Sequence, residues 1–212
     1  MTLYVPSHFR VEDPAVLDDF IARNAFGTLV SSGPEGLQVS HIPFIAERAT
    51  DGALRLLGHV ARANPHAQAL AAAEHVVAIF QGPHAYVSPT WYEHHPAVPT
   101  WNYAVVHAYG RATLMDEAGL RSLLEKLSGT YEAGRPNPWR MADAPPDFIG
   151  KLLGVIVGFS IAVQRLDGKF KLSQNRPGND PLRVADALES AGEEGLASLM
   201  RDHKPRRQEL PG

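Results

Sequence analysis

Three short segments of this sequence carry groups that could bind a ligand, and the first of them suits a phosphate. The first is Gly58-His59-Val60-Ala61-Arg62-Ala63-Asn64-Pro65, where an expected strand ends and an expected helix begins. The start of a helix presents free backbone N–H groups and partial positive charge, and the Arg62 guanidinium adds a two-pronged donor, so the segment suits a terminal phosphate. An ordinary helix start beside a solvated arginine is the alternative, and it is the simpler interpretation of this segment taken alone.

The second segment is Lys171-Leu172-Ser173-Gln174-Asn175-Arg176, which follows the pair Asp167-Gly168. Its charged groups, Lys171 and Arg176, flank neutral hydrogen-bonding side chains at the end of an expected strand, a frequent place for ligand contacts. A polar strand end that caps a helix explains the same residues equally well.

The third segment is the strand Gln38-Val39-Ser40-His41-Ile42-Pro43-Phe44. If Ile42 faces the core, the alternation of a strand places Ser40 on the same side and His41 on the other. Pro43 has no N–H to donate, so the strand lies at a sheet edge or bulges there, which frees backbone groups for a ligand. A barrel edge protected against aggregation is the alternative, and these residues alone favour it somewhat.

Residues 80–110 hold two of the three Trp residues of the chain, together with four Tyr and four His. Rings with polar edges suit the stacking and hydrogen bonding of a flat ligand, and they also fill the core of a β-hairpin. The residues alone leave these two interpretations open. Ala104 to Tyr109 has the alternation of a barrel strand.

Several other chemistries lack support in the sequence. The absence of Cys excludes disulfides and thiolate chemistry. His94 and His95 are adjacent and would point to opposite faces of an extended chain, so we expect no metal site. No P-loop, Rossmann glycine motif or Gly-x-Ser-x-Gly elbow occurs. The net charge of −3 argues against a general nucleic-acid coat, although a local basic patch such as Lys204-Pro205-Arg206-Arg207 is compatible with it.

The elements that must position these residues follow from turn signals and hydrophobic periodicity. Helices are expected over 14–24, 64–73, 116–131 and 180–201, and a loop over 135–146. Strands are expected over 26–32, 37–46, 54–59, 75–81, 100–115 and 151–166, with a tight turn at Asp167-Gly168 leading into 169–173. Several strands joined by short turns, with helices inserted, predict one barrel-like α+β domain over 1–212 that ends in a helical extension at about 180–203.

The chain is expected to be cytoplasmic. Its first residues lack the basic and apolar regions of a signal peptide. Its longest apolar run, Leu152 to Val163, is interrupted by Gly154, Gly158 and Ser160 and is too short to span a bilayer.

The order of several motifs resembles the PaiB-type family, described as FMN-binding negative transcriptional regulators, and more distantly the pyridoxine-phosphate-oxidase-like split barrels. The resemblance extends from the first residues to about Asn175. It rests on Tyr4-Val5-Pro6-Ser7-His8-Phe9, Asn24-Ala25-Phe26-Gly27-Thr28-Leu29, Ser40-His41-Ile42-Pro43, the segment 58–65, Phe80-Gln81-Gly82-Pro83-His84, Ser88-Pro89-Thr90-Trp91-Tyr92, Val98-Pro99-Thr100-Trp101-Asn102-Tyr103, Gly158-Phe159 and Lys171-Leu172-Ser173-Gln174-Asn175.

The resemblance implies an FMN-binding split β-barrel with flanking helices, and a homodimer with FMN at the subunit interface. Carried onto this sequence, the FMN contacts come from four places. They are the strand residues Ser40, His41, Ile42 and Pro43 at the isoalloxazine edge; His59, Ala61, Arg62 and Asn64 near the ribityl phosphate; Trp101 and Asn102 from the partner subunit; and Lys171, Ser173, Gln174 and Asn175 as further polar contacts. The segment Glu93-His94-His95-Pro96 is expected to form a loop over this pocket. Where the oxidases place an Arg-Lys pair, this loop has one Arg. Two alternatives follow: a second cation such as Lys171 shares the phosphate charge, or the flavin binds weakly.

Three functions are compatible with these residues. The first is a flavin-binding regulator that alters transcription directly or indirectly, although no helix-turn-helix is evident and direct DNA binding has no support in motif or charge. The second is an FMN-dependent oxidoreductase acting on an unknown small molecule, without the second basic cluster that pyridoxine phosphate would need. The third and weakest is a haem-binding or haem-degrading protein that uses one of His84, His94, His95 or His107 as axial ligand. The sequence favours a regulator over an enzyme.

Overall fold

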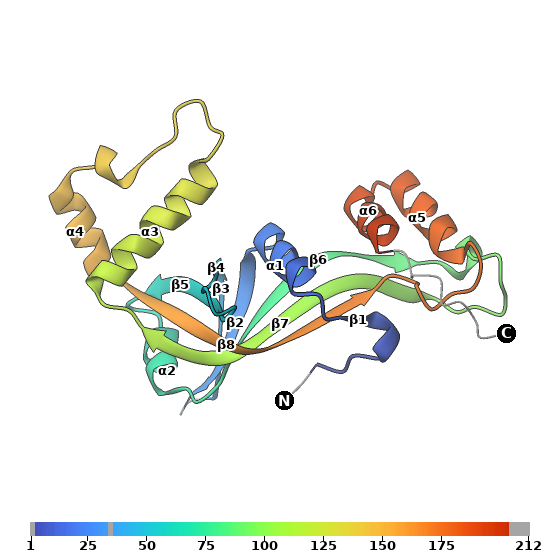
Figure 1. The fold of residues 1–212 in the computed structure, drawn as a ribbon, viewed down its shortest axis with the longest axis horizontal. Coiled ribbons are helices and arrows are strands. Elements are labelled where there is room, and N and C mark those ends of the chain that lie inside the picture. Colours follow the sequence, from blue (N-terminus) through green and yellow to red (C-terminus); the bar gives the residue numbers. More distant parts are fainter. Residues whose placement is uncertain (1–2, 34–35, 204–212) are drawn as a thin grey trace. The chain divides into compact units, whose positions relative to one another are not determined.

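The computed structural model describes residues 3–33 and 36–203 (Figure 1). The elements in chain order are η1 Ser7–Phe9, β1 Arg10–Val11, α1 Pro14–Arg23, β2 Phe26–Gly33, β3 Gly36–Pro43, β4 Ile45–Arg48, β5 Leu54–Ala61, α2 His66–Ala72, β6 Val76–Val87, η2 Pro89–Trp91, β7 Thr100–Leu114, α3 Glu117–Glu132, η3 Met141–Asp143, α4 Pro146–Gly154, β8 Ile156–Lys171, α5 Asp180–Ser190 and α6 Glu194–Asp202. The basic tail at 204–207 lies outside the described residues. None of the helices in the described ranges combines the length and apolar character that a bilayer span requires.

The strands form one sheet in the order β3-β2-β6-β7-β8-β5-β4, and β1 pairs with β8. β2 runs antiparallel to both β3 and β6, and β5 runs antiparallel to both β4 and β8. β3 ends the order of the sheet, as Pro43 predicts for an edge strand. A large antiparallel sheet with inserted helices confirms the expected α+β class.

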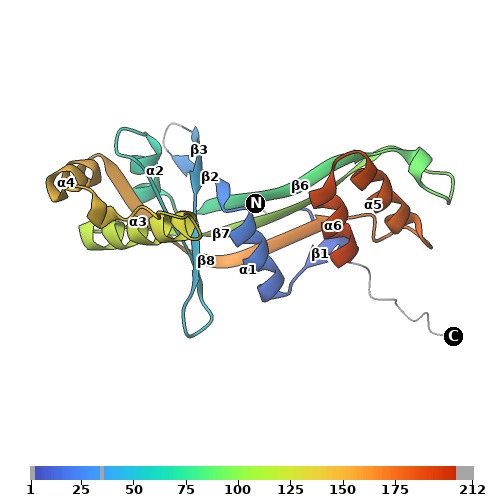
Figure 2. The same ribbon diagram turned by 90° about the horizontal axis from the view of Figure 1, so that it is seen from above.

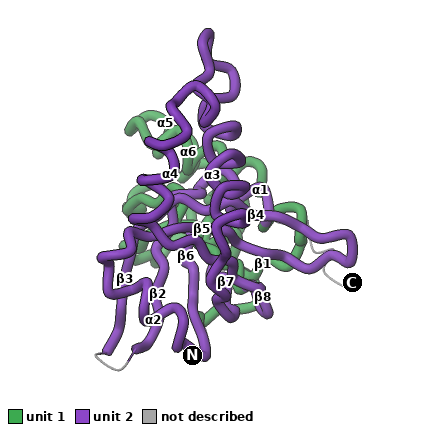
Figure 3. Tube along the Cα trace, turned by 90° about the vertical axis from the view of Figure 1, so that its left-hand side faces the viewer, with its two compact units in different colours: residues 1–17, 81–106, 167–212 green, residues 18–80, 107–166 purple. Residues whose placement is uncertain are grey.

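The chain divides into two compact units (Figure 3). Unit 1 comprises residues 1–17, 81–106 and 167–212, and unit 2 comprises residues 18–80 and 107–166. The long strands β6, β7 and β8 contribute residues to both units.

The core of unit 2 centres on the Phe44 ring, which meets the Phe80 and Phe159 rings edge to face at centroid distances of 5.4 and 6.3 Å. Such T-shaped pairs suit the charge distribution of aromatic rings. Gly58 makes room for this cluster, since a Cβ there would lie 2.9 Å from Cζ of Phe159. Helices α3 and α4 stand beside each other in Figure 1, and Leu153 of α4 packs with Leu120 of α3.

The core of unit 1 lies between the end of β8 and the last two helices, α5 and α6, which pack side by side (Figure 2). Phe170, Val184, Leu188 and Leu196 are almost completely buried. The helical segment expected over 180–201 consists of two helices, because Gly192 adopts φ 85° and ends the first of them.

The strand expected over 151–166 is wrong in its first part, because residues 146–154 form helix α4. Pro146 occupies the first helical turn, where its missing N–H costs nothing, and Ile149 and Leu153 form a buried stripe against α3. Gly150 and Gly154 favour a break in the sequence pattern, but this packing outweighs their low helix propensity.

The tight turn expected at Asp167-Gly168 is also wrong, because β8 continues through both residues to Lys171. Gly168 pairs with Val11 of β1, and a Cβ at Gly168 would lie 2.5 Å from Cδ2 of Leu17 and 2.8 Å from the Val11 carbonyl oxygen. The glycine therefore permits a close approach of β1 and α1 and does not reverse the chain.

Two smaller differences concern strand lengths. The strand expected over 37–46 is divided at Phe44, whose N–H donates to the Ala25 carbonyl, and the chain then pairs with β5 from Ile45 onward. β6 extends to Val87, six residues beyond the expected end at Gln81, and it contains Pro83.

Candidate functional site

The strand β3 presents Ser40 and Ile42 to the interior and His41 to solvent, as the alternation predicts. His41 Nδ1 lies 3.0 Å from the Thr28 hydroxyl of β2. Pairing with β2 occupies one edge of β3, and β3 ends the described sheet order, so its other edge can offer backbone groups to a ligand.

Arg62 immediately follows β5, and its side chain is fixed on the protein surface. Nε donates to the Gly154 carbonyl at 2.8 Å and Nη2 donates to the Ile156 carbonyl at 3.1 Å. The Arg62 backbone N–H donates to the Val155 carbonyl at 2.8 Å. The guanidinium carries five donors, so these contacts orient it and leave donors for an anion.

The backbone around α2 offers less to a phosphate than the sequence suggests. The His66 N–H donates to Oδ1 of Asn64 at 3.0 Å, and the Ala67 N–H donates to the Asn64 carbonyl at 2.9 Å. The Gln68 and Ala69 N–H groups both donate to the Pro65 carbonyl. Because the first turn of this short helix already uses its N–H groups, the donors for a phosphate here have to come from side chains.

A buried polar network joins β2, β3 and the start of α2. His66 is fully buried, with Nδ1 2.9 Å from the Ser40 hydroxyl and Nε2 3.0 Å from the Ser31 hydroxyl. Asn64 Nδ2 donates to the Ser40 hydroxyl at 3.1 Å. Burial lowers the pKa of His66, so the ring is neutral and carries one donor and one acceptor, which the two hydroxyls can match.

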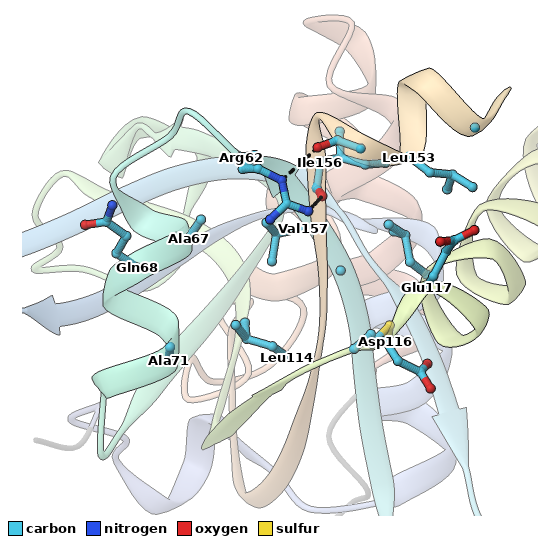
Figure 4. A pocket seen from close by; sticks show the side chains of 15 residues that line it. Arg62, Ala67, Gln68, Ala71, Leu114, Asp116, Glu117, Leu153, Ile156 and Val157 are labelled. Carbon is cyan, nitrogen blue, oxygen red and sulfur yellow. Dashed lines mark hydrogen bonds between the residues drawn. The ribbon is translucent and has the colours of Figure 1, made fainter. Parts of the chain in front are cut away.

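A pocket of about 570 Å³ lies beside Arg62 in unit 2 (Figure 4). Its volume is within the range of small-molecule sites. Arg62 and Gln68 line one side, apolar side chains such as Leu120 and Leu153 line the walls, and Asp116 and Glu117 stand across from Arg62 in Figure 4. An anion would bind near Arg62, away from the two carboxylates.

His59 provides an orphaned polar atom in unit 2. Its Nδ1 is buried without a hydrogen-bond partner among the described residues, and burial lowers the pKa of the ring. Buried polar atoms are usually paired, so an unpaired one marks a place where a ligand can supply the missing partner. Ala61, two residues further along β5, is exposed.

In unit 1, Lys171 is half-buried and its ammonium donates to the Thr100 hydroxyl and to the Trp101 carbonyl, both at 2.6 Å. Burial and the nearby Lys169 lower its pKa. Lys169 itself lies over the Tyr103 ring at 5.4 Å from the centroid. Two lysines and an aromatic ring thus share this part of the sheet.

Trp101 is 55% exposed, and its ring lies 6.2 Å from the Tyr86 ring and 6.4 Å from the His84 ring, centroid to centroid. An exposed indole flanked by two further rings can stack on a flat ligand. Residues 80–110 therefore combine ring-bearing surface side chains with the buried strand residues Ala104, Val106 and Ala108.

The remaining candidates in unit 1 are held within the protein. Asn102 and Ser173 are buried and joined by hydrogen bonds of 2.9 and 3.2 Å, and Ser173 has φ 62°. Gln174 accepts from the Leu172 N–H at 2.7 Å and donates to the Phe170 carbonyl at 2.5 Å. Asn175 is exposed. Lys171, Trp101 and Asn175 are thus more accessible to a ligand than Asn102 and Ser173.

The loop after β6 is fastened to α5. Asp180 is fully buried and accepts from the Glu93 N–H at 2.7 Å, while Nδ1 of His94 lies 3.3 Å from the same carboxylate oxygen. Nη2 of Arg176 bonds the His94 carbonyl at 2.8 Å and Asp180 at 3.3 Å. The segment 93–96 is therefore held by an ionic cluster, which sequence reasoning did not identify.

Sequence reasoning also missed His66 and Ser31. One pattern in the sequence could have indicated His66. It directly follows Asn64-Pro65 and lies on the buried face of α2, together with Ala69 and Leu70. No signal in the sequence connects Ser31 with a residue 35 positions later.

The residues of unit 2 can be compared with what FMN requires. FMN carries a phosphate, a polyhydroxyl chain and a flat ring with hydrogen-bonding edges. Arg62 offers donors for the phosphate, the orphaned Nδ1 of His59 offers a polar contact, and the outer edge of β3 offers backbone groups. This donor set fits FMN, and Arg62 is the one cation in it.

The chain has close and distant relatives. It is 35% identical over 203 residues to the "Protease synthase and sporulation protein PAI 2" of Bacillus subtilis, a match that covers 94% of this chain and 97% of that protein. It is 34% identical over 242 residues to an uncharacterised protein of Aspergillus fumigatus, covering 88% of this chain and 92% of that protein.

Solved structures with similar folds include an FAD- and haem-binding protein from Mycobacterium smegmatis, with 17% identity, a TM-score of 0.59, and coverage of 76% of this chain and 73% of that chain. A flavocytochrome from Azotobacter vinelandii has 16% identity and a TM-score of 0.59, and the match covers 82% of this chain and 73% of that chain. At these identities the likeness concerns the fold, and it agrees with the expected split barrel.

The model of the family described as "Putative FMN-binding domain" matches residues 3–165, which is most of the chain. This match and the relative from B. subtilis confirm the resemblance found in the sequence motifs. The chain therefore belongs to this FMN-binding family of split-barrel proteins, and FMN is its cofactor.

Proposed function

We propose that the chain is an FMN-binding regulator of the PaiB type that lowers the expression of target genes, directly or through another protein. The main support for the flavin site is the position of Arg62. Its exposed guanidinium is oriented by two carbonyls and lies beside a pocket of about 570 Å³. The regulatory role is supported by the family resemblance and by the name of the B. subtilis relative, which calls that protein a sporulation protein.

In this proposal, unit 2 holds the phosphate end of FMN. The phosphate binds the remaining donors of Arg62 on the side of Gln68, where it is separated from Asp116 and Glu117. His59 and Ala61 lie near the ribityl chain. The free edge of β3, from Ser40 to Pro43, meets the hydrogen-bonding edge of the isoalloxazine ring.

The partner subunit of a homodimer supplies the rest of the site. Trp101 is the stacking ring, and Lys171 is the second cation that a phosphate site with a single arginine needs. Asn102 and Ser173 act indirectly, because their hydrogen bonds hold the start of β7 against the end of β8. Gln174 and Asn175 provide polar groups at the border of the flavin site. Trp101 and Lys171 suit these roles because Lys171 bonds the Trp101 carbonyl, so the ring and the cation share one anchored strand end.

FMN supplies a ring system that can be reduced reversibly and whose absorption and fluorescence report binding. The protein binds and orients this ring, and regulation then requires that flavin binding changes what the dimer contacts. A specific promoter fragment retarded by the purified protein at physiological salt would support direct action. An FMN-dependent oxidoreductase is the alternative, and steady bleaching of the bound flavin by NADPH with turnover of a second substrate would favour it.

The phosphate contact is tested by replacing Arg62 with Ala and titrating with both FMN and riboflavin, which lacks the phosphate. A hydrogen bond to a charged group contributes about 1.5–3 kcal/mol, so FMN affinity should fall roughly 10- to 100-fold. Riboflavin affinity should change much less, because the arginine contacts only the phosphate. Flavin fluorescence quenching measures both affinities.

The riboflavin arm is needed because Arg62 also bonds the carbonyls of Gly154 and Ile156, so its loss disturbs the α4–β8 junction. A structural disturbance alone would weaken both ligands by the same factor. Equal loss for FMN and riboflavin, or unchanged FMN affinity, would exclude Arg62 as the phosphate ligand.

A further inference from the structure

The proposed contacts of unit 2 with FMN come from two separate segments, the strand β3 and the loop after β5. A ligand that spans both segments binds well only if their relative position is fixed before binding, since otherwise ordering them reduces the affinity. The structure contains a buried connection between them, and His66 is at its centre.

His66 contacts both segments through separate groups. Its Nδ1 lies 2.9 Å from the hydroxyl of Ser40 on β3, and its backbone N–H donates to Oδ1 of Asn64 at 3.0 Å. Asn64 closes the ring by donating from Nδ2 to the same Ser40 hydroxyl at 3.1 Å. Ser40, Asn64 and His66 thus form a closed cycle that joins β3 to the loop carrying Arg62.

The second ring nitrogen has a different task. Nε2 of His66 lies 3.0 Å from the hydroxyl of Ser31 on β2, and Ser31 is 2% exposed. β2 is an interior strand between β3 and β6, and no flavin contact is assigned to it. The Nε2 bond therefore anchors the ring in the core, whereas the Nδ1 bond connects the two flavin-binding segments.

We infer that His66 is a positioning residue for flavin binding, acting through its Nδ1 bond to Ser40. This inference rests on the proposed function, because it assumes that FMN spans β3 and the Arg62 loop. His66 is fully buried and does not touch the ligand. It fixes the distance between the edge of β3 and the guanidinium that receives the phosphate.

Two amide substitutions distinguish the roles of the two ring nitrogens of His66. The side-chain amide of Asn stands where Nδ1 of His stands, and that of Gln reaches the place of Nε2. His66→Asn therefore retains the bond to Ser40 and loses the bond to Ser31, and His66→Gln does the opposite. Both variants replace the ring by a smaller polar group, so they serve as matched controls for the loss of packing.

The experiment measures the FMN dissociation constant by fluorescence quenching, the absorption spectrum of the bound flavin, and the melting temperature of the apoprotein. His66→Ala and His66→Gln should weaken FMN binding about tenfold, and His66→Asn should restore it to within about threefold of the wild type. All three variants should melt at lower temperature than the wild type. A second pair of variants tests the same two bonds from the serine side. FMN binding should be weaker in Ser40→Ala and unchanged in Ser31→Ala.

A purely structural role gives a different result, in which flavin affinity follows the melting temperature and Asn and Gln are equivalent. That result, or wild-type affinity in His66→Gln, would overturn the inference. If the amide variants do not fold, the serine pair decides the question. The Ser40 hydroxyl is bonded to His66 and Asn64, and the proposed flavin contact of β3 uses its backbone edge, which Ser40→Ala leaves unchanged. Failure of the proposed function gives a different result. In that case Arg62→Ala reduces the affinities for FMN and riboflavin equally, whatever the His66 variants show.

Discussion

We expect two histidines, the buried His66 and the partly buried His59, to make the stability of this protein depend on pH. Burial lowers the pKa of both His59 and His66 below the ordinary value of 6.5. The unfolded chain therefore takes up protons as the pH falls through about 6.5, while the folded protein keeps both rings neutral until a lower pH. The stability that depends on the neutral rings is complete above that pH and is lost as the pH falls below it.

We expect the free energy of unfolding, measured in urea, to decrease between pH 7 and pH 5. His66→Asn should make this decrease shallower, because the variant removes one of the two rings that must be protonated on unfolding. An unchanged slope in His66→Asn would show that His66 does not contribute to the pH dependence.

At the residue level, local rules predicted the direction of side chains better than their partners. The alternation along 38–44 correctly placed Ser40 inside and His41 outside. The same rules could not predict that Arg62 is oriented by Gly154 and Ile156, which lie 92 and 94 residues further along the chain. Contacts of this kind depend on the tertiary fold, and a single sequence does not reveal the pairing of β5 with β8.

At the scale of elements, the helix starts at Asp13-Pro14 and at Asp116 were predicted closely, because an Asp and a following Pro or capping bond act locally. The helix α4 and the uninterrupted strand β8 were not predicted. In α4, the packing of Ile149 and Leu153 against α3 outweighs the low helix propensity of the glycines. In β8, Gly168 leaves room for the Leu17 side chain, which fills the space of a Cβ.

Glycine 110 of β7 offers a test of close packing between strands. A Cβ at this position would lie 2.2 Å from the Ala162 carbonyl oxygen and 2.8 Å from Cγ2 of Ile161. The carbonyl belongs to the backbone and cannot move aside easily. Gly110→Ala should therefore lower the free energy of unfolding by about 2 kcal/mol or more, as measured by chemical denaturation.

Gly129→Ala is the control for this substitution. Gly129 lies within α3, and apart from its chain neighbours and the nearby helix backbone, a Cβ there would meet none of the described atoms within 4 Å. Alanine has a higher helix propensity than glycine, so the control should gain about 0.5–1 kcal/mol. Opposite signs for the two variants would confirm that the effect at Gly110 is steric, and equal signs would contradict it.

For the whole molecule, the fold class and the family were within reach of the sequence because the ordered motifs extend over most of the chain. The division into two units was not, because β6, β7 and β8 cross the boundary without any change in composition. The candidate site shows the same limit. Its residues were found as separate motifs, and they fall into two groups, one in each unit, with Arg62 in unit 2 and Trp101 in unit 1.

This separation makes the composition of the proposed flavin site testable by mixing two defective chains. If each site uses Arg62 of one subunit and Trp101 of its partner, then Arg62→Ala and Trp101→Ala chains each form homodimers with two impaired sites. A heterodimer of the two has one doubly impaired site and one intact site. Random pairing in a closed dimer should then give high FMN affinity at about a quarter of all sites.

Co-expression of the two chains with different affinity tags, followed by purification through both tags, isolates the heterodimer. Titration with FMN should show one high-affinity flavin per heterodimer, with the absorption spectrum of the wild-type complex. If both residues served the site from the same chain, each site of the heterodimer would keep one defect and no high-affinity binding would return. The stoichiometry therefore decides whether Trp101 acts across the dimer, because only a site shared between subunits can combine the intact Arg62 of one chain with the intact Trp101 of the other.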